Sequence, residues 1–202
     1  MPGRIGDRDV PAYADEEGVD PRRRTETFAE VELELDNWRW AGTRFRLRSA
    51  KAMGADRKQV AVRFRSVPHL PFGHSGEELP NVLRFELEPE GPALDLTGIG
   101  AHAHELAPLS LTARMEPPVL PAYGRLLLDV FRGDPALSLR ADEAEEAWRV
   151  LEPVLSAWEQ DLVPLEEYPA GSDGPAARID PADTRRRREA LLHDPPPPAA
   201  EG

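Results

Sequence analysis

The hydrophobic pattern divides the chain into a strand-rich first half and a helical second half. Between about residues 29 and 115, apolar and polar positions alternate with a period of two, which is typical of half-buried strands. Strands are expected at residues 30–36, 44–48, 60–65, 83–88 and, more weakly, 109–113. Because the apolar side chains lie on one face of each strand, an antiparallel sheet with one covered face is predicted.

Charged side chains occupy the polar faces of these expected strands. Acids alternate along residues 30–36, whereas arginines alternate along residues 44–48. Opposite charges on neighbouring strands stabilise a sheet by about 0.2–1 kcal/mol per pair. Cross-strand pairing therefore explains most of these charges without a ligand.

Two helices are expected after the strands. The first runs from Pro121, a favoured first-turn residue, to Phe131, and Gly133 is a suitable stop. The second opens at Asp142, whose carboxylate can cap the helix, and Glu145 resembles its capping-box partner.

The second helix carries one apolar stripe, which is predicted to pack as core against the sheet. The stripe consists of Trp148, Leu151, Val154, Leu155 and Trp158. Pro153 lies inside the helix and is expected to bend it, because proline lacks an amide hydrogen. The predicted fold is α+β, a large and mainly antiparallel sheet with helices packed on one face.

The two ends of the chain differ from this middle part. Residues 1–24 are predicted to be a polar, poorly ordered lead-in, whose final arginines form a solvated patch. Order is expected to fade from about Tyr168, and residues 176–202 are basic and Pro-rich, as in a disordered tail. Residues 25–175 are then the folded domain.

The composition of the chain argues against some classes of partner. A net charge of −12 argues against a general nucleic-acid binder. No apolar run approaches the roughly 20 residues of a membrane span, so no membrane partner is expected. The first residues lack the apolar segment of a secretory signal, and the chain contains no cysteine, so a cytoplasmic location is expected.

No complete catalytic constellation is present in the sequence. It contains neither a G-x-G-x-x-G turn after a strand nor a P-loop. His102 and His104 have a spacing that would place them on one face of a strand, but nearby glycine and proline favour a loop, and no acid cluster completes a metal site. The expectation is no catalytic and no metal-binding residue.

Lys51 is the strongest binding candidate, because it follows an expected strand where the sheet gives way to a loop. Arg57 and Lys58 come shortly after it, and several cations on one loop can hold a phosphate or orient sugar hydroxyls. Two other interpretations remain open: an exposed basic turn, and an unrelated sheet domain that binds small anions at these three residues.

Three motifs within 27 residues resemble one known family: TETF at 25–28, DNWRWAG at 36–42 and LRSAK at 47–51. The helical segment AYGRLLLDV at 122–130 and YPAGSDGP at 168–175 extend the similarity. Together they resemble the C-terminal domain of glucose-6-phosphate dehydrogenase over about residues 10–175.

The resemblance implies a fold and a reaction. In this family the antiparallel sheet forms the dimer interface, and the substrate lies between this domain and a Rossmann domain. Hydride passes from C1 of glucose 6-phosphate to NADP and gives the lactone, with a histidine of the Rossmann half as base. The glycines that bind the nucleotide and this histidine have no counterpart in the present sequence.

The resemblance also suggests site residues. Lys51 matches a family lysine that contacts the sugar phosphate. A second basic residue usually lies five positions on, where this chain has Asp56, so Arg57 is expected to substitute for it. Ala50 replaces a glycine of the motif, which would add strain if the backbone there required a positive φ.

The leading hypothesis is therefore a C-terminal domain of a glucose-6-phosphate dehydrogenase, a pentose phosphate pathway enzyme. It predicts no activity without the Rossmann half, a homodimer through the sheet and a separate Rossmann-domain partner. The alternative is a non-catalytic dimerisation or regulatory module, or a degenerate remnant.

Overall fold

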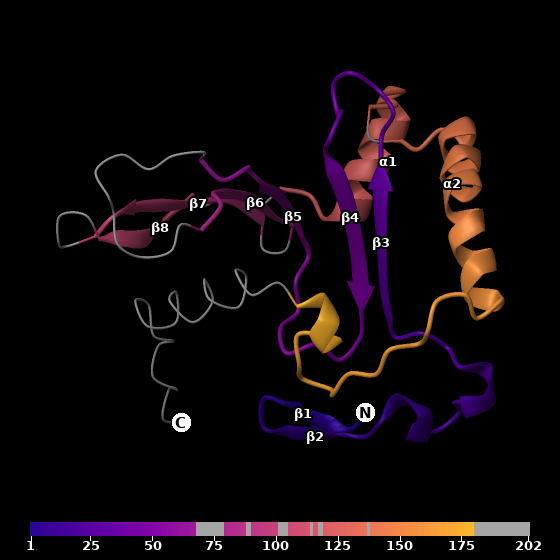
Figure 1. Ribbon diagram of the computed structural model, residues 1–202. Coiled ribbons are helices and arrows are strands. Elements are labelled where there is room, and N and C mark those ends of the chain that lie inside the picture. Colours follow the sequence, from indigo (N-terminus) through magenta and orange to yellow (C-terminus); the bar gives the residue numbers. More distant parts are fainter. Residues whose placement is uncertain are drawn as a thin grey trace, which may run out of the picture. The chain divides into compact units, whose positions relative to one another are not determined.

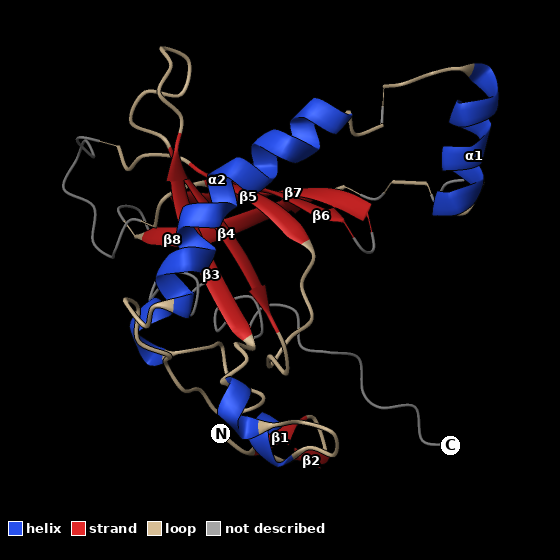
Figure 2. Ribbon diagram, turned by 90° about the vertical axis from the view of Figure 1, so that its right-hand side faces the viewer, coloured by secondary structure: helices blue, strands red, loops and turns tan. Residues whose placement is uncertain are grey.

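The computed structural model describes residues 1–67, 79–87, 90–100, 105–113, 115–116, 119–136 and 138–179. The chain forms two compact units, Met1–Gly54 with Pro118–Ala176 and Ala55–Pro117 with Ala177–Gly202. Both units contain antiparallel strands, and the first also carries the two helices (Figures 1 and 2). The predicted α+β class is confirmed. In the described residues no helix is both long and apolar enough to cross a membrane.

The strands of the first unit form two separate hairpin-like ribbons. They are β1 (Gly3–Ile5) with β2 (Arg8–Val10), and β3 (Phe28–Glu34) with β4 (Arg44–Ala50). Both pairs are antiparallel. The structure thus confirms the strands expected near residues 30–36 and 44–48, whereas β1 and β2 are too short and polar to give an alternation signal.

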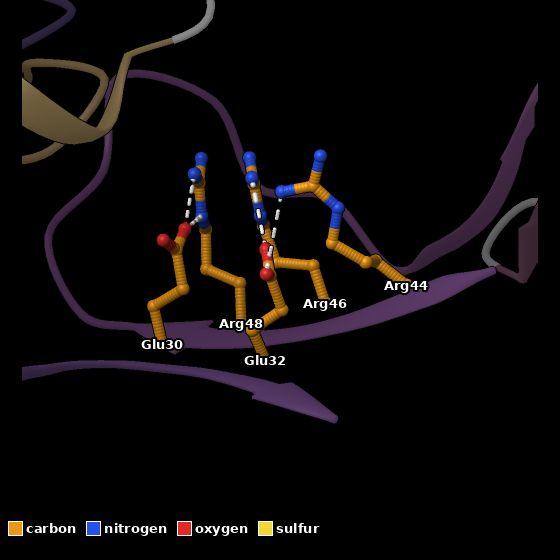
Figure 3. Close-up of polar contacts among 5 residues, drawn as sticks. All are labelled: Glu30, Glu32, Arg44, Arg46 and Arg48. Atoms are coloured by element: carbon orange, nitrogen blue, oxygen red, sulfur yellow. Dashed lines mark hydrogen bonds and ion pairs between the residues drawn. The ribbon is translucent and has the colours of Figure 1, made fainter. Parts of the chain in front are cut away.

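Ion pairs connect the polar faces of β3 and β4, as the charge pattern predicts (Figure 3). The register places Glu30 opposite Arg48 and Glu32 opposite Arg46. Arg48 Nε donates to Glu30 at 2.9 Å, and Glu32 accepts from Arg46 at 3.3 Å and from Arg44 at 3.5 Å. These arginines are therefore already engaged with acids of their own ribbon.

The lead-in of residues 1–24 is ordered, contrary to expectation. It contains β1, β2 and two short 3-10 helices, η1 (Tyr13–Asp15) and η2 (Pro21–Arg23). Arg24, which follows η2, donates to both carboxylate oxygens of Asp161 at 2.6 and 2.8 Å. Contacts with residues distant in sequence stabilise this segment, and a local hydrophobic pattern does not reveal such contacts.

The helices of the first unit are α1 (Ala122–Arg132) and α2 (Ala141–Glu159). Gly133 ends α1 in a left-handed conformation with φ of +67°, as predicted, while Pro121 is its N-cap and not a first-turn residue. The capping box proposed at Asp142 and Glu145 is wrong. The chain is still extended at Arg140, so the helix starts at Ala141, and Glu143 accepts from the Arg140 amide at 3.0 Å.

The apolar stripe of α2 is only partly covered. Figure 1 draws α2 beside the β3–β4 ribbon and Figure 2 draws it across the ribbon, and Leu151, Val154 and Trp158 are half-buried. Trp148 and Leu155, however, are exposed, at 68% and 39%, so the expectation that the whole stripe packs as core is wrong at these two positions. The helix continues through Pro153.

The second unit is a four-stranded antiparallel meander, in which each strand pairs with the next one in the chain. Its strands are β5 (Gln59–Arg63), β6 (Val82–Leu87), β7 (Glu90–Ile99) and β8 (Leu106–Thr112). The sequence pattern does not predict β7, because Gly91 and Pro92 weaken a strand signal. Pro92 lies near the start of β7, and its carbonyl accepts from the Ala113 amide at 3.1 Å.

Candidate functional site

Lys51 lies directly after β4, as predicted, at the end of the β3–β4 ribbon. Its amide donates to the Thr27 carbonyl at 2.8 Å, one step beyond the last ladder pair, Phe28 with Ala50. The main chain of Lys51 is thereby fixed to the sheet, while the residue as a whole remains exposed. An exposed ammonium group on a fixed backbone is suited to binding an anionic group from solvent.

Tyr168 also holds the Lys51 backbone, although order was expected to fade at this residue. Tyr168 is buried, with 8% exposure. Its hydroxyl lies 2.8 Å from the Lys51 carbonyl, 2.9 Å from the Thr27 carbonyl and 3.1 Å from the Thr27 hydroxyl. A tyrosine hydroxyl has one hydrogen, so it donates to one carbonyl at a time and can accept from the Thr27 hydroxyl.

Backbone hydrogen bonds secure Ala52 and Gly54, which follow Lys51 in the same turn. The Gly171 amide donates to the Ala52 carbonyl at 2.8 Å, and the Gly54 amide donates to the Ser172 carbonyl at 2.9 Å. Residues 51–54, here termed the Lys51 turn, are therefore bound along their length by residues 168–172, here termed the C-terminal strap.

The C-terminal strap contacts β1 on its other side. The Arg4 amide donates to Ala170 at 3.2 Å, and the Ala170 amide donates to Met1 at the same distance. Gly171 has a φ of +79°, and a Cβ there would lie 1.7 Å from the Arg4 carbonyl oxygen. Only glycine fits this position, because both the backbone conformation and the close approach exclude a side chain.

The strain expected at Ala50 does not occur there. Ala50 ends β4 in regular pairing with Phe28, and the positive φ falls on Ala52, at +52°. A non-glycine residue in this region costs free energy unless its surroundings hold it there. For Ala52 the bond from Gly171 to its carbonyl provides part of that restraint.

Phe28 forms the apolar side of this junction. The Tyr168 ring meets it edge to face, with ring centroids 5.8 Å apart, and the Arg48 guanidinium lies 5.4 Å from its centre. Such contacts contribute about 0.5–1.5 kcal/mol each beyond area burial. They keep Tyr168 in the orientation that its hydroxyl bonds require.

Arg57 and Lys58, the other predicted cations, belong to the second unit, directly before β5. The Lys58 carbonyl accepts from the Leu87 amide at 2.7 Å, which attaches this segment to β6. Asp56 is exposed. The proposed pairing of Lys51 with Arg57 thus joins residues of two units and stays a prediction.

All five histidines, including His102 and His104, lie outside the described residues. Within the described part, no group of three or more His, Cys, Asp or Glu side chains could hold a metal ion. The sequence contains the TETF and YPAGSDGP motifs, but its patterns do not predict that Thr27, Tyr168 and Gly171 hold the Lys51 turn. Their proximity to Lys51 depends on long-range contacts that no periodicity encodes.

Comparison with known proteins shows which family the chain belongs to. A family model described as glucose-6-phosphate dehydrogenase, C-terminal domain, matches residues 1–188. The glucose-6-phosphate 1-dehydrogenase of Mycolicibacterium smegmatis is 44% identical over 198 residues, which cover 92% of this chain and 39% of the relative. That of Treponema pallidum is 40% identical over 188 residues, covering 88% and 36%.

Solved structures give the same result. A glucose-6-phosphate dehydrogenase in complex with its substrate glucose-6-phosphate superposes with a TM-score of 0.70 at 26% identity, covering 86% of this chain and 37% of that one. The enzyme from Mycobacterium avium has a TM-score of 0.64 at 31% identity, covering 88% and 37%.

The chain therefore belongs to the glucose-6-phosphate dehydrogenase family, a family of oxidoreductases, and corresponds to its C-terminal domain. It spans somewhat more than a third of the length of the relatives it matches.

Proposed function

We propose that this chain supplies the substrate-binding and dimer-forming part of a glucose-6-phosphate dehydrogenase. With a Rossmann half it would oxidise glucose 6-phosphate to 6-phosphogluconolactone and reduce NADP, in the cytoplasmic pentose phosphate pathway. The observation that carries the proposal is Lys51, an exposed cation on a backbone fixed by Thr27 and Tyr168, at the position that matches the family's substrate lysine.

In this proposal Lys51 binds the phosphate of glucose 6-phosphate through charge-assisted hydrogen bonds. Arg57 is the second cation and substitutes for the basic residue that the family usually has at the position of Asp56. Neither residue transfers a proton or hydride. NADP and the catalytic base belong to the Rossmann half, so the chain alone is expected to be inactive.

Dimerisation through the sheet is supported by the second unit. Val60 pairs with Phe85 across β5 and β6, and both side chains are about half exposed, at 53% and 44%. Leu109 and Leu111 of β8 are exposed to a similar degree, at 48% and 54%. Exposed apolar strand faces of this kind are typical of association surfaces.

The test is NADP reduction with glucose 6-phosphate, measured with this chain alone and after mixing with a separately expressed Rossmann half from the family. We expect activity only in the mixture. Lys51→Ala should then raise KM by about tenfold or more, as expected for a lost hydrogen bond to a charged group. Arg8→Ala, which changes an exposed cation of β2, is the matched control and should leave KM unchanged.

Activity of the chain alone would contradict the proposed division of labour. An inactive mixture, with an intact family enzyme working under the same conditions, would favour the alternative, a non-catalytic dimerisation or regulatory module or a remnant. Ala50→Gly and Asp56→Arg would then test whether restoring the family residues restores activity.

A further inference from the structure

We infer that Tyr168 is a positioning residue for substrate binding, because its hydroxyl lies within hydrogen-bond distance of the main-chain carbonyls on both sides of the Lys51 junction and donates to one of them at a time. The inference rests on the proposed function, since it assigns Tyr168 a role only if Lys51 binds the substrate. Tyr168 acts through Lys51 and does not itself touch glucose 6-phosphate.

Thr27 directly precedes β3 and Lys51 directly follows β4, and their backbones are joined by the bond from the Lys51 amide to the Thr27 carbonyl at 2.8 Å. The Tyr168 hydroxyl reaches both carbonyls, at 2.9 and 2.8 Å. It therefore closes the end of the ribbon, where a two-stranded sheet would otherwise fray.

Tyr168 is 8% exposed and packs edge to face on Phe28, whereas Lys51 is exposed. A buried hydroxyl has to find partners inside the protein, because an unpaired one keeps the full cost of its desolvation. The partners of the Tyr168 hydroxyl are Thr27 and the main chain of Lys51. This requirement therefore fixes the backbone from which the lysine side chain extends.

Ala52, the next residue of the Lys51 turn, has a left-handed φ of +52°, which an alanine adopts only under restraint. The bonds from Gly171 to Ala52 and from Gly54 to Ser172 apply that restraint from the C-terminal strap. Tyr168 begins the same strap, so it couples the order of the strap to the direction in which Lys51 leaves the sheet.

The consequence is a specific energetic link. Without the hydroxyl, the Lys51 turn can sample more conformations, and binding glucose 6-phosphate must then order it again. This cost appears in affinity for the substrate and not in the chemical step. It also disappears when Lys51 itself is absent, because the turn then has no binding group to orient.

The experiment is a titration of glucose 6-phosphate into the full chain, followed by the 31P signal of the ligand. Tyr168→Phe removes the hydroxyl and keeps the ring, and Tyr123→Phe is the matched control, since Tyr123 is 82% exposed. We expect Tyr168→Phe to weaken binding about twofold to tenfold, the range for one lost hydrogen bond. Tyr123→Phe should have no effect.

A double-mutant cycle separates positioning from a general loss of structure. On the Lys51→Ala background, Tyr168→Phe should have no further effect on affinity if it acts through Lys51. Where mixing with the Rossmann half restores turnover, Tyr168→Phe should raise KM and leave kcat unchanged.

Hydrogen exchange on the unmodified chain provides a readout without substitution. The amides of Lys51, Gly54 and Gly171 should be protected, and Tyr168→Phe should lower this protection locally. Exchange of these amides at the rate of open loops in the unmodified chain would overturn the inference.

The failures can be told apart. If Lys51→Ala weakens binding while Tyr168→Phe behaves like Tyr123→Phe, the positioning role is wrong and the proposed function stands. If the unmodified chain does not bind glucose 6-phosphate even after mixing with the Rossmann half, or if Lys51→Ala binds it equally well, the proposed substrate contact is wrong and the role of Tyr168 is rejected with it.

Discussion

The two units of this chain achieve order in opposite ways. In the second unit each strand of the β5–β8 meander pairs with its neighbour in sequence. In the first unit, the junction around Lys51 joins β1, the end of the β3–β4 ribbon and the C-terminal strap, and the Tyr168 bonds to Thr27 and Lys51 span 141 and 117 residues. The candidate site thus lies in the unit whose order depends on distant parts of the chain.

This difference matters for function. The connections from β6 to β7 and from β7 to β8 are short and cost little loop-closure entropy, so these three strands can form from local contacts. The junction in the first unit closes only when three distant segments meet, so its loss should be cooperative and should affect the Lys51 turn directly. The substitutions below test this difference, from the largest expected effect to the smallest.

The largest effect is expected from Gly171→Ala. Its Cβ would lie 1.7 Å from the Arg4 carbonyl oxygen in a backbone with φ of +79°, so the strap would have to leave β1. We expect a loss of about 3–5 kcal/mol in the free energy of unfolding, as for other severe steric conflicts. Urea unfolding measures it.

Gly18→Ala is the matched control for this substitution. Gly18 has a similar φ of +84°, but no atom lies within 4 Å of the added Cβ. Its cost should be only the conformational one, about 1–2 kcal/mol. Equal losses for both substitutions would show that the contact between the strap and β1 does not stabilise the first unit.

An intermediate effect is expected from Arg84→Met in the second unit. Arg84 donates to both carboxylate oxygens of Asp95, at 2.8 and 3.2 Å, and this bond raises the pKa of its guanidinium, with further contributions from Glu86. The Asp95 side chain is only 13% exposed, so removal of its partner should cost about 1–3 kcal/mol.

Arg44→Met in the first unit makes the comparison sharper. Arg44 also pairs across strands, with Glu32 at 3.5 Å, but its side chain is 68% exposed. Solvent and salt screen such a pair, so the expected change is within about 0.5 kcal/mol. Unfolding at low and high salt measures the stability of both variants. A larger loss for Arg44→Met than for Arg84→Met would mean that burial does not decide the strength of these pairs.

A smaller change in stability, but a clear change in assembly, is expected from Val62→Lys. Val62 on β5 is 44% exposed, so its replacement should cost less than about 1 kcal/mol. If the sheet forms the dimer, sedimentation should show weaker self-association. Leu127→Lys on α1, where the side chain is 55% exposed, is the control, and equal weakening by both would argue against an interface confined to the sheet.

The smallest effect is expected from Glu146 in α2. Its hydrogen bond with Arg149 holds the pKa of the carboxyl below its ordinary value of 4.5. The stabilisation is therefore present above pH 4.5 and is lost as the pH falls through the lower pKa of the folded state. Circular dichroism should show a slightly smaller acid-induced loss of helix for Glu146→Gln, and an identical profile would show that the pair contributes nothing.

Sequence reasoning predicted the local elements well. Alternation located β3, β4, β5 and β6, the charge pattern predicted the Glu–Arg pairs of the β3–β4 ribbon, and Gly133 marked the end of α1. It missed β7, because Pro92 and Gly91 hide the pattern, and it placed the N-cap of α2 two residues too late, at Asp142 instead of Arg140. Both errors occur where the local sequence pattern is weak. Strand pairing can override such weak propensity.

The sequence by itself determined the α+β class, the family through its motifs, and Lys51 as the binding candidate. Only the tertiary structure decided that residues 1–24 are ordered, that the positive φ falls on Ala52 and not on Ala50, and that Tyr168 holds Lys51. The physical reason is the distance along the sequence between the residues that interact. Periodicity and capping depend on residues a few positions apart, whereas a buried hydroxyl or a glycine without room for a Cβ is defined by segments that meet only in the folded chain.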